Sequence, residues 1–226
     1  MLRAIALDDE PAALEIIQRH AEKIPFLELK QTFVSTAEAL SFLHNEAIDL
    51  IFLDIQMPDM LGTDFVKLLQ NKPILVVFTT AFSEFAVEGF QLQVLDYLLK
   101  PIEFSRFLQA CNRAYEKISV RKGEAASIFV KDGYDWVRVN LEEIIFIQSD
   151  TNLLFIHEKS RKISTRMTIA EMLEILPTEK FIRIHRSFIV AKKAIQKIER
   201  SQVLVGNITI PLAGNYKEML EEQLLK

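Results

Sequence analysis

Short apolar runs, each followed by a polar residue, are the feature that most constrains the fold of the first half of this chain. The runs cover residues 2–7, 50–53, 74–79 and 97–99 and are rich in Val, Ile, Leu and Phe. They are too short for buried helices and are typical of strands that are buried on both faces. Segments with helical spacing of apolar residues lie between them, at 11–24 and 103–118. Strands that alternate with helices predict a parallel, doubly wound sheet.

Five chemically active residues lie at the carboxyl ends of these predicted strands: Asp8, Asp9, Asp54, Thr80 and Lys100. The carboxyl ends of parallel strands meet at one edge, where ligands bind in such sheets. Three carboxylates placed there cannot all stay ionised without a counter-charge. Magnesium is the expected cation, because it prefers oxygen ligands, whereas zinc would require His or Cys.

A carboxylate beside such a cation can attack a phosphoryl group and form an acyl phosphate. Lys100 and the Thr80 hydroxyl would then contact the phosphoryl oxygens. Each residue taken alone has an ordinary structural explanation, since acidic pairs occur in turns and lysines on surfaces. Their joint occurrence at successive strand ends favours a phosphoryl site.

The segments around these positions resemble the signatures of the response-regulator receiver family. The resemblance covers residues 1 to about 120 and implies a flavodoxin-like fold with a five-stranded parallel sheet. It rests on Leu7-Asp8-Asp9-Glu10-Pro11, Leu53-Asp54-Ile55-Gln56-Met57-Pro58, Thr80-Ala81 and Asp96-Tyr97-Leu98-Leu99-Lys100-Pro101.

The resemblance also implies a role for each position. Asp54 would accept the phosphoryl group from a sensor histidine kinase, and Mg²⁺ would be held by Asp8, Asp9, Asp54 and the backbone carbonyl of Gln56. Thr80 would be the switch hydroxyl, Tyr97 the aromatic side chain whose rotamer follows it, and Lys100 the partner of the phosphate. Pro101 would follow a cis peptide bond, which only X-Pro bonds adopt at low cost.

Length and charge predict a second domain. The chain has 226 residues, enough for two domains. Residues 1–120 hold 10 Lys and Arg and 17 Asp and Glu, a net charge of −7, whereas 121–226 hold 17 and 14, a net charge of +3. We therefore expect a receiver-like domain at 1–120, a linker at 121–127 and a basic domain at 128–226. No apolar run reaches membrane-spanning length, so we expect a cytoplasmic protein without a membrane partner.

Many short strands are predicted after the linker, because the apolar pattern changes to period two or to short runs. The expected strands are 128–131, 136–141, 144–148, 153–157, 162–167, 181–190, 195–198, 203–205 and 208–210. Helical spacing remains only at 169–176 and 216–225, so this half should be mainly β.

The densest polar pattern of this half lies at 181–190, where Arg183, His185 and Ser187 alternate with apolar residues and Lys192 follows. A β-rich domain can bind DNA with lysine and arginine on phosphates and a few side chains on base edges. A solvated strand face would have the same pattern, so the pattern alone leaves both open.

Residues 127–225 resemble the LytTR DNA-binding family, chiefly through 181–190, the preceding 169–176 helix and Ile210-Pro211-Leu212. The resemblance implies loops that enter successive major grooves of direct-repeat promoter sites. It implies DNA contact through Asn152, Arg183, Arg186 and Ser187, and through the loop after Pro211.

Two positions depart from the LytTR pattern. Ala191 stands where the family usually has Asn, and Gly214 followed by Asn215 stands where an arginine is common. An arginine there could make a bidentate guanine contact worth about 1–3 kcal/mol. Glycine cannot, so we expect an altered base preference, with Asn215 as the candidate replacement.

The hypothesis is a two-component transcription regulator that dimerises when phosphorylated and is no enzyme beyond turnover of its own aspartyl phosphate. One alternative is an aspartyl-phosphate hydrolase, but such enzymes typically have an acid two residues after the nucleophile, where this chain has Gln56. The other is a receiver whose β-rich output domain binds a protein partner instead of DNA.

Overall fold

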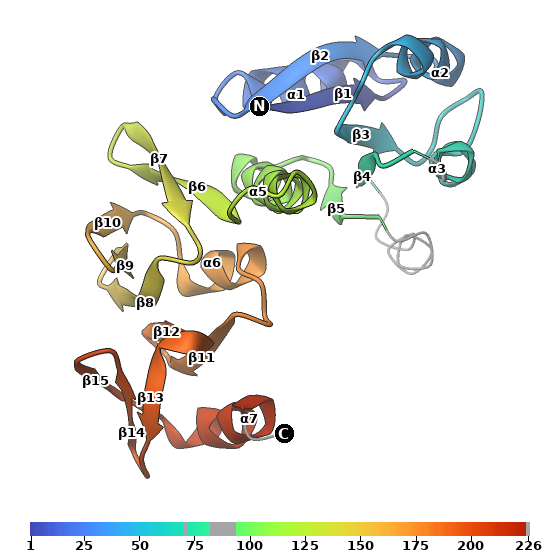
Figure 1. Ribbon diagram of the computed structural model, residues 1–226. Coiled ribbons are helices and arrows are strands. Elements are labelled where there is room, and N and C mark those ends of the chain that lie inside the picture. The colour runs from blue at the N-terminus through green and yellow to red at the C-terminus, as the bar shows by residue number, and fades with distance from the viewer. Residues whose placement is uncertain (70–71, 82–93, 225–226) are drawn as a thin grey trace. The chain divides into compact units, whose positions relative to one another are not determined.

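The chain divides into two units, Met1–Lys122 and Gly123–Lys226. The computed structural model describes residues 1–69, 72–81 and 94–224 (Figure 1). The last helix of the first unit, α5, spans Phe104–Arg121 and therefore continues beyond the predicted end at 118. Its final turns still pack, since Ile118 and Ser119 are buried and the Arg121 guanidinium donates to the Pro73 carbonyl at 2.7 Å.

The first unit is a five-stranded parallel sheet in the order β2-β1-β3-β4-β5, which confirms the predicted fold class. The first three connections between its strands each contain a helix, in the doubly wound manner. The strands are β1 (Leu2–Leu7), β2 (Leu27–Phe33), β3 (Leu50–Asp54), β4 (Leu75–Thr80) and β5 (Asp96–Leu99). The described helices before α5 are α1 (Pro11–Ala21), α2 (Thr36–Asn45) and α3 (Gly62–Leu68).

The apolar runs found four of these strands and missed β2. The central strands β3 and β4 are buried along their whole length, which explains their continuous hydrophobicity. β2 lies at the edge of the sheet, and its middle residues Lys30 and Gln31 are exposed. An edge strand with solvent-exposed residues has no continuous apolar run, so the hydrophobic pattern does not reveal it.

Helices pack on both faces of this sheet. Ala39 and Leu43 of α2 and Phe65 of α3 share a core with one set of alternating strand residues, including Ile5, Leu7, Ile51 and Leu53. On the opposite face, Phe52 of β3 stacks on Phe107 of α5 with ring centroids 4.6 Å apart. Helices therefore cover both faces, so a ligand site in this sheet is expected at the ends of the strands.

An ion pair joins β1 to the start of β3. The Asp49 carboxylate accepts from the Arg3 amide at 3.0 Å and from the Arg3 guanidinium at 3.1 and 3.2 Å, while the Asp49 amide donates to the Arg3 carbonyl at 2.9 Å. Burial alone would raise the pKa of Asp49, but the hydrogen bonds and charge of Arg3 lower it below its usual 3.8.

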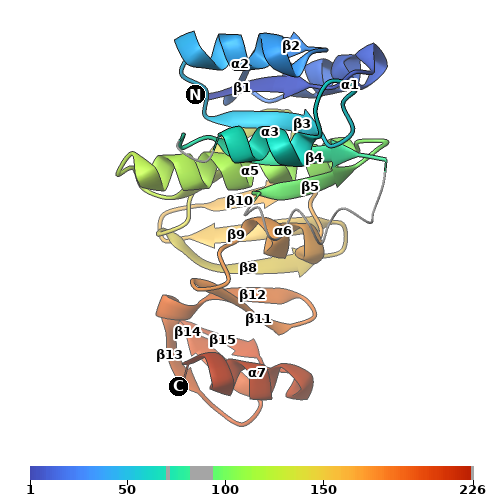
Figure 2. The same cartoon turned by 90° about the vertical axis from the view of Figure 1, so that its right-hand side faces the viewer.

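The second unit is mainly β, as expected, with three sheets ordered β10-β9-β8-β12-β11, β13-β14-β15 and β6-β7. Figure 2 shows the five strands of the largest sheet side by side. The strands are β6 (Ser127–Asp132), β7 (Asp135–Asn140), β8 (Ile144–Asp150), β9 (Leu153–Glu158), β10 (Lys162–Thr165), β11 (Phe181–His185), β12 (Phe188–Ala191), β13 (Ile195–Ile198), β14 (Gln202–Val205) and β15 (Ile208–Pro211).

The expected single strand at 181–190 is wrong. The segment forms a hairpin in which β11 and β12 pair antiparallel, with Phe181 opposite Ala191 and His185 opposite Phe188. Arg186 and Ser187 make the turn, and a register shift lies between Arg183 and His185. The alternating pattern hides the reversal because no Gly, Pro, Asn or Asp marks the turn.

Two α-helices and a short 3-10 helix, η1 (Lys192–Ala194), complete the second unit. The first α-helix, α6 (Ile169–Ile175), begins with a capping box in which Thr168 and Glu171 exchange hydrogen bonds, which fixes its start. The second α-helix, α7 (Gly214–Leu224), begins two residues before the predicted start, and the predicted end at Leu225 lies outside the described residues. Among the residues that the structure describes, no helix combines the length and apolar character needed to cross a bilayer.

We predict that Asp49→Asn weakens the first unit by about 1 kcal/mol at pH 7, since the half-exposed guanidinium limits the contribution of the pair. Because the folded pKa of Asp49 is lowered, its contribution is complete above the unfolded value and declines as the pH falls, from about pH 5 downward. Urea unfolding followed at NMR signals of β1 and β3 should show the difference from wild type shrinking with acid.

Asp64→Asn is the matched control, because its carboxylate pairs with Lys67 on an exposed helix surface. This variant should stay within about 0.5 kcal/mol of wild type. Equal effects of the two substitutions would contradict the role given to Asp49.

Candidate functional site

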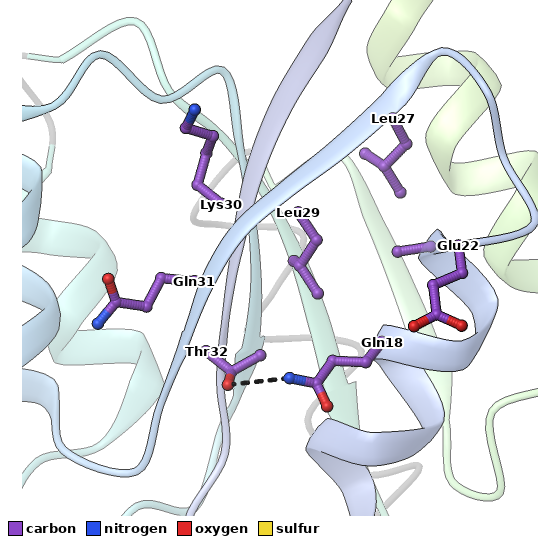
Figure 3. Close-up of a pocket in the computed structure, with 8 residues that line it drawn as sticks. Gln18, Glu22, Leu27, Leu29, Lys30, Gln31 and Thr32 are labelled. Atoms are coloured by element: carbon purple, nitrogen blue, oxygen red, sulfur yellow. Dashed lines mark hydrogen bonds between the residues drawn. The ribbon is translucent and has the colours of Figure 1, made fainter.

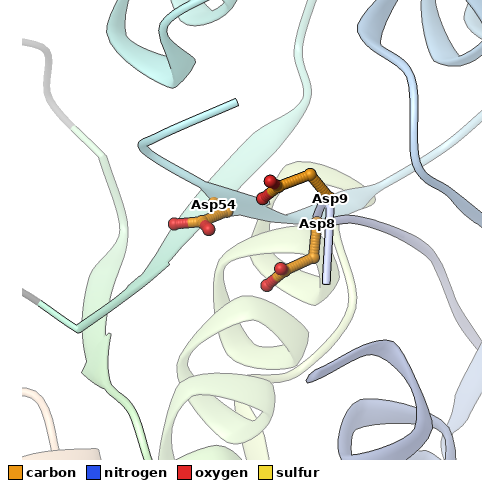
Figure 4. A group of neighbouring side chains, drawn as sticks. All are labelled: Asp8, Asp9 and Asp54. Atoms are coloured by element: carbon orange, nitrogen blue, oxygen red, sulfur yellow. The ribbon is translucent and has the colours of Figure 1, made fainter. Parts of the chain in front are cut away.

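Three carboxylates lie together at the carboxyl edge of the first sheet (Figure 4). Asp54 is the last residue of β3, and Asp8 and Asp9 follow β1 directly. One carboxylate oxygen from each lies within 4.8 Å of the others. Asp8 and Asp54 are buried and Asp9 is exposed, so the cluster is open to solvent on the Asp9 side.

Lys100 places its ammonium group among these carboxylates. Its Nζ lies 2.9 Å from Oδ2 of Asp8, 3.0 Å from Oδ2 of Asp54 and 3.2 Å from Oε2 of Glu10. Lys100 follows β5, so the ammonium group joins the ends of β1, β3 and β5. The peptide bond between Lys100 and Pro101 is cis, as the receiver resemblance predicted.

Burial and ion pairing compete at this site. Burial lowers the pKa of Lys100, but hydrogen bonds to Asp8 and Asp54 outweigh it and raise the pKa above 10.5. Burial raises the pKa of Asp8, and hydrogen bonds from Lys100 and the Glu10 amide oppose this only in part. One ammonium group thus stabilises the carboxylates incompletely, which is the condition that favours a second cation.

The ligand atoms at this site suit a hard divalent cation. They are oxygens from three carboxylates, and among the described residues this is the one cluster of three or more acidic, His or Cys side chains with such spacing. Magnesium binds through one or two protein carboxylates and keeps several waters, which the exposed side at Asp9 permits.

Thr80 and Tyr97 are the next groups along the same edge. Thr80 ends β4 and is buried, and its carbonyl accepts from the Lys100 amide at 2.8 Å. The Tyr97 side chain shares a hydrogen bond with the Thr80 side chain. Burial raises the pKa of Tyr97, and this hydrogen bond opposes the shift. Thr80 therefore contacts Lys100 through its main chain and Tyr97 through its side chain.

The sequence reasoning missed two residues near Asp54, namely Asp59 in the following loop and Gly62 at the start of α3. The amide of Gln56 donates to Oδ1 of Asp54 at 3.4 Å, and the Gly62 amide donates to the Ile55 carbonyl at 2.8 Å. A methyl group on Gly62 would overlap the Asp54 carbonyl oxygen and lie 3.0 Å from Cα of Ile55. Asp59 accepts from the Thr36 amide at 2.9 Å, which ties this loop to α2. The motif around Asp54 gave no sign of either contact.

In the second unit, two turns lie at the same end of the largest sheet. The β8–β9 turn holds Asn152, and the β11–β12 turn holds Arg186 and Ser187. β12 pairs with β8 so that Phe188 faces Gln148, and the Ser149 amide donates to the Ser187 carbonyl at 2.8 Å. The side chains of Asn152 and Arg186 are exposed, so this end presents a neutral amide group and a charged guanidinium group to solvent.

Asn215 belongs to the same end but lies on a helix. The expected loop after Pro211 is short, because α7 begins at Gly214 and places Asn215 in its first turn. The amide of Ala213 donates to the carbonyl of Ile184 at 3.1 Å, which fixes the start of α7 beside β11. Asn215 is exposed there.

Two predicted DNA residues are placed differently. The Arg183 guanidinium donates to the carbonyls of His185 at 3.2 Å and Arg186 at 2.9 Å, and it lies 5.5 Å from the ring centroid of Tyr216. Arg183 therefore stabilises the β11–β12 turn through these two hydrogen bonds. Lys192 follows the other end of β12, where its amide donates to the Lys180 carbonyl at 2.8 Å, so the structure does not bring it near Arg186.

Comparison with known proteins finds two family matches. Residues 4–112 match the response regulator receiver domain, and residues 134–225 match the LytTr DNA-binding domain. The transcriptional regulatory protein YpdB of Escherichia coli (strain K12) is 32% identical over 219 residues, covering 88% of this chain and 86% of that protein. The transcriptional regulatory protein BtsR of Salmonella typhi is 27% identical over 241 residues, covering 99% of each.

Among solved structures, the response regulatory domain of protein mrkE from Klebsiella pneumoniae is 28% identical, with a TM-score of 0.48. It covers 54% of this chain and is itself covered completely. A LytTr DNA-binding domain from Bacillus cereus is 21% identical, with a TM-score of 0.39, and covers 43% of this chain and 95% of its own.

We predict that Gly62→Ala displaces the Asp54 backbone, because the new methyl group meets main-chain atoms that cannot rotate away. The expected result is a loss of about 1–3 kcal/mol of stability, with amide NMR shifts concentrated at residues 54–56.

Gly214→Ala is the matched control, since a methyl group there meets no atom within 4 Å and the glycine has no positive φ. It should leave the shifts of residues 54–56 unchanged. A Gly62→Ala protein with wild-type shifts at Asp54 would contradict the close approach.

Proposed function

The chain belongs to the response regulators that join a receiver domain to a LytTR DNA-binding domain, and on this premise we propose that phosphorylation of Asp54 controls binding of promoter DNA by the second unit. The observation that carries the proposal is the buried Asp54 carboxylate, held 3.0 Å from the Lys100 ammonium group beside Asp8 and Asp9. No other described group of side chains combines a nucleophile, a phosphate-binding cation and a metal-binding pair.

The donor would be a phosphohistidine of a sensor histidine kinase. A carboxylate oxygen of Asp54 attacks phosphorus, the P–N bond to histidine breaks, and the imidazole nitrogen keeps the electron pair and takes a proton. The product is an aspartyl phosphate. Lys100 offers its ammonium group to a phosphoryl oxygen, and because it already lies 3.0 Å from Asp54 it needs little movement to do so. Water would later hydrolyse the same acyl phosphate, which is the chain's only expected turnover.

Magnesium would be held by Asp8, Asp9, Asp54 and the Gln56 backbone carbonyl. When bound, it supplies positive charge to the phosphoryl oxygens as negative charge develops on them. The support for this assignment is the all-oxygen donor set and the excess of carboxylates over the single Lys100 ammonium group.

The signal would leave the site through Thr80. A phosphoryl group on Asp54 offers new acceptor oxygens, and the Thr80 hydroxyl can turn to one of them. That movement would end its hydrogen bond with Tyr97 and free the ring to change rotamer. The change would favour a different receiver surface, and we propose that two phosphorylated chains pair through it.

The output would be DNA binding at direct-repeat promoter sites. Asn152, Arg186, Ser187 and Asn215 lie at one end of the second unit and are proposed to contact DNA there. Lys192 would hold a phosphate elsewhere, and Arg183 would act by shaping the turn that carries Arg186. A pair of output domains reaches two half-sites with a higher effective concentration than one domain does.

We predict that Asp54→Asn abolishes labelling by radioactive acetyl phosphate in the presence of Mg²⁺, because an amide cannot form the acyl phosphate. Asp64→Asn, which alters an exposed helix carboxylate, should be labelled like wild type. Label that persists on the Asp54→Asn protein would show that another residue is the acceptor.

We predict that Arg186→Ala weakens binding of the phosphorylated chain to a selected promoter fragment and lowers the slope of log K against log salt by about 1. Lys159→Ala is the control, since Lys159 lies at the opposite end of β9 and pairs with Glu143 at 3.7 Å. If the phosphorylated wild type bound no specific fragment more tightly than competitor DNA, the result would instead favour a protein partner for the output domain.

A further inference from the structure

A groove in the first unit lies at the edge of the sheet opposite Asp54. It has a volume of about 410 Å³ and is bordered by the amino ends of β1, β3 and β4 together with the final turns of α2 and α5. Its apolar lining includes Leu43, Ile48, Ile74 and Ile118. This size lies within the ~300–1,000 Å³ range of small-molecule pockets.

Positive charge is in excess around this groove. Four of its lining side chains are cationic, namely Arg3, Lys72, Arg121 and Lys122, and two are acidic, namely Glu46 and Asp49. Asp49 already accepts three hydrogen bonds from Arg3, and Lys122 is 3.9 Å away from it. The groove therefore combines an apolar interior with a border that favours an anion.

Backbone carbonyls hold two of these cations in place. The ammonium group of Lys72 donates to the Leu43 carbonyl at 2.5 Å, and one nitrogen of Arg121 donates to the Pro73 carbonyl at 2.7 Å. An ammonium group has three N–H donors and a guanidinium five, so each keeps donors beyond these bonds. Cations fixed in position lose less entropy on binding an anion than freely rotating ones do.

Two other grooves among the described residues lack this combination. The groove between α1 and β2 has Gln18, Gln31 and Thr32 in its lining, and its one lysine, Lys30, pairs with Glu28 at 2.9 Å (Figure 3). The groove at Phe181 and Ala191 is lined by three lysines and two acids, and two of the lysines, Lys180 and Lys193, pair with Glu142. Neither groove has the four cations against two acids found at Ile118.

We propose that the groove at Ile118 binds a small amphipathic carboxylate, with its apolar body against the Ile and Leu side chains and its head group on Arg121 and Lys122. These two residues end the first unit, so the ligand would join the end of α5 to the starts of β1 and β4. The site is independent of phosphoryl transfer, because Asp54 lies at the other edge of the sheet.

The test titrates full-length protein carrying labelled Ile, Leu and Val methyl groups with decanoate below its micellar concentration, and with decanol as the neutral probe. We expect saturable methyl shifts confined to Leu43, Ile48, Ile74 and Ile118, and tighter binding of decanoate than of decanol. Arg121→Gln combined with Lys122→Gln should weaken decanoate binding about fivefold and leave decanol unaffected.

Ala47→Phe should weaken both probes, because this exposed lining residue would fill the groove without disturbing the core. Lys30→Gln, in the other groove, should change neither. Shifts scattered over the surface, equal binding of the two probes, or wild-type binding by Ala47→Phe would each overturn the proposal. Acetyl-phosphate labelling of the same variants should be normal, which separates a failure here from a failure of the Asp54 assignment.

Discussion

The ammonium group of Lys100 is the interaction on which the rest of the receiver site depends. It lies within 3.2 Å of carboxylates from Asp8, Glu10 and Asp54, and so connects residues that follow or end three different strands. Without it, the buried carboxylates of Asp8 and Asp54 would repel each other with no opposite charge between them. With it, the cluster keeps an excess of negative charge while the Asp54 carboxylate stays 3.0 Å from the ammonium group.

The same edge explains how a local reaction could reach a distant surface. Thr80 contacts both sides of this edge, because its carbonyl accepts from the Lys100 amide at 2.8 Å and its side chain shares a hydrogen bond with Tyr97. In the second unit, Arg183 has a comparable role, because it holds two carbonyls of the turn that presents Arg186. Both units thus place a chemically active residue on a main chain that neighbouring side chains keep in position.

The sequence placed Asp8, Asp54 and Lys100 at one sheet edge, as the structure does, because each ends or directly follows a strand whose buried run is easy to detect. It missed β2, whose exposed residues break the apolar pattern, and it missed Gly62, whose need for space arises from a backbone that folds back onto Asp54. It also read 181–190 as one strand, since the turn at Arg186 and Ser187 has no Gly, Pro, Asn or Asp. Local apolar patterns indicate which segments are buried. They do not show where the main chain turns back or where two distant segments approach closely.

The central claim is that phosphoryl chemistry at Asp54 changes DNA binding by the second unit. The most direct measurement is the dissociation constant of the full chain for a DNA fragment selected from a random pool, before and after treatment with acetyl phosphate and Mg²⁺ at fixed salt. We expect tighter binding after phosphorylation, by about 5- to 150-fold, the range typical of allosteric coupling. An unchanged constant with Asp54 fully phosphorylated would contradict the claim.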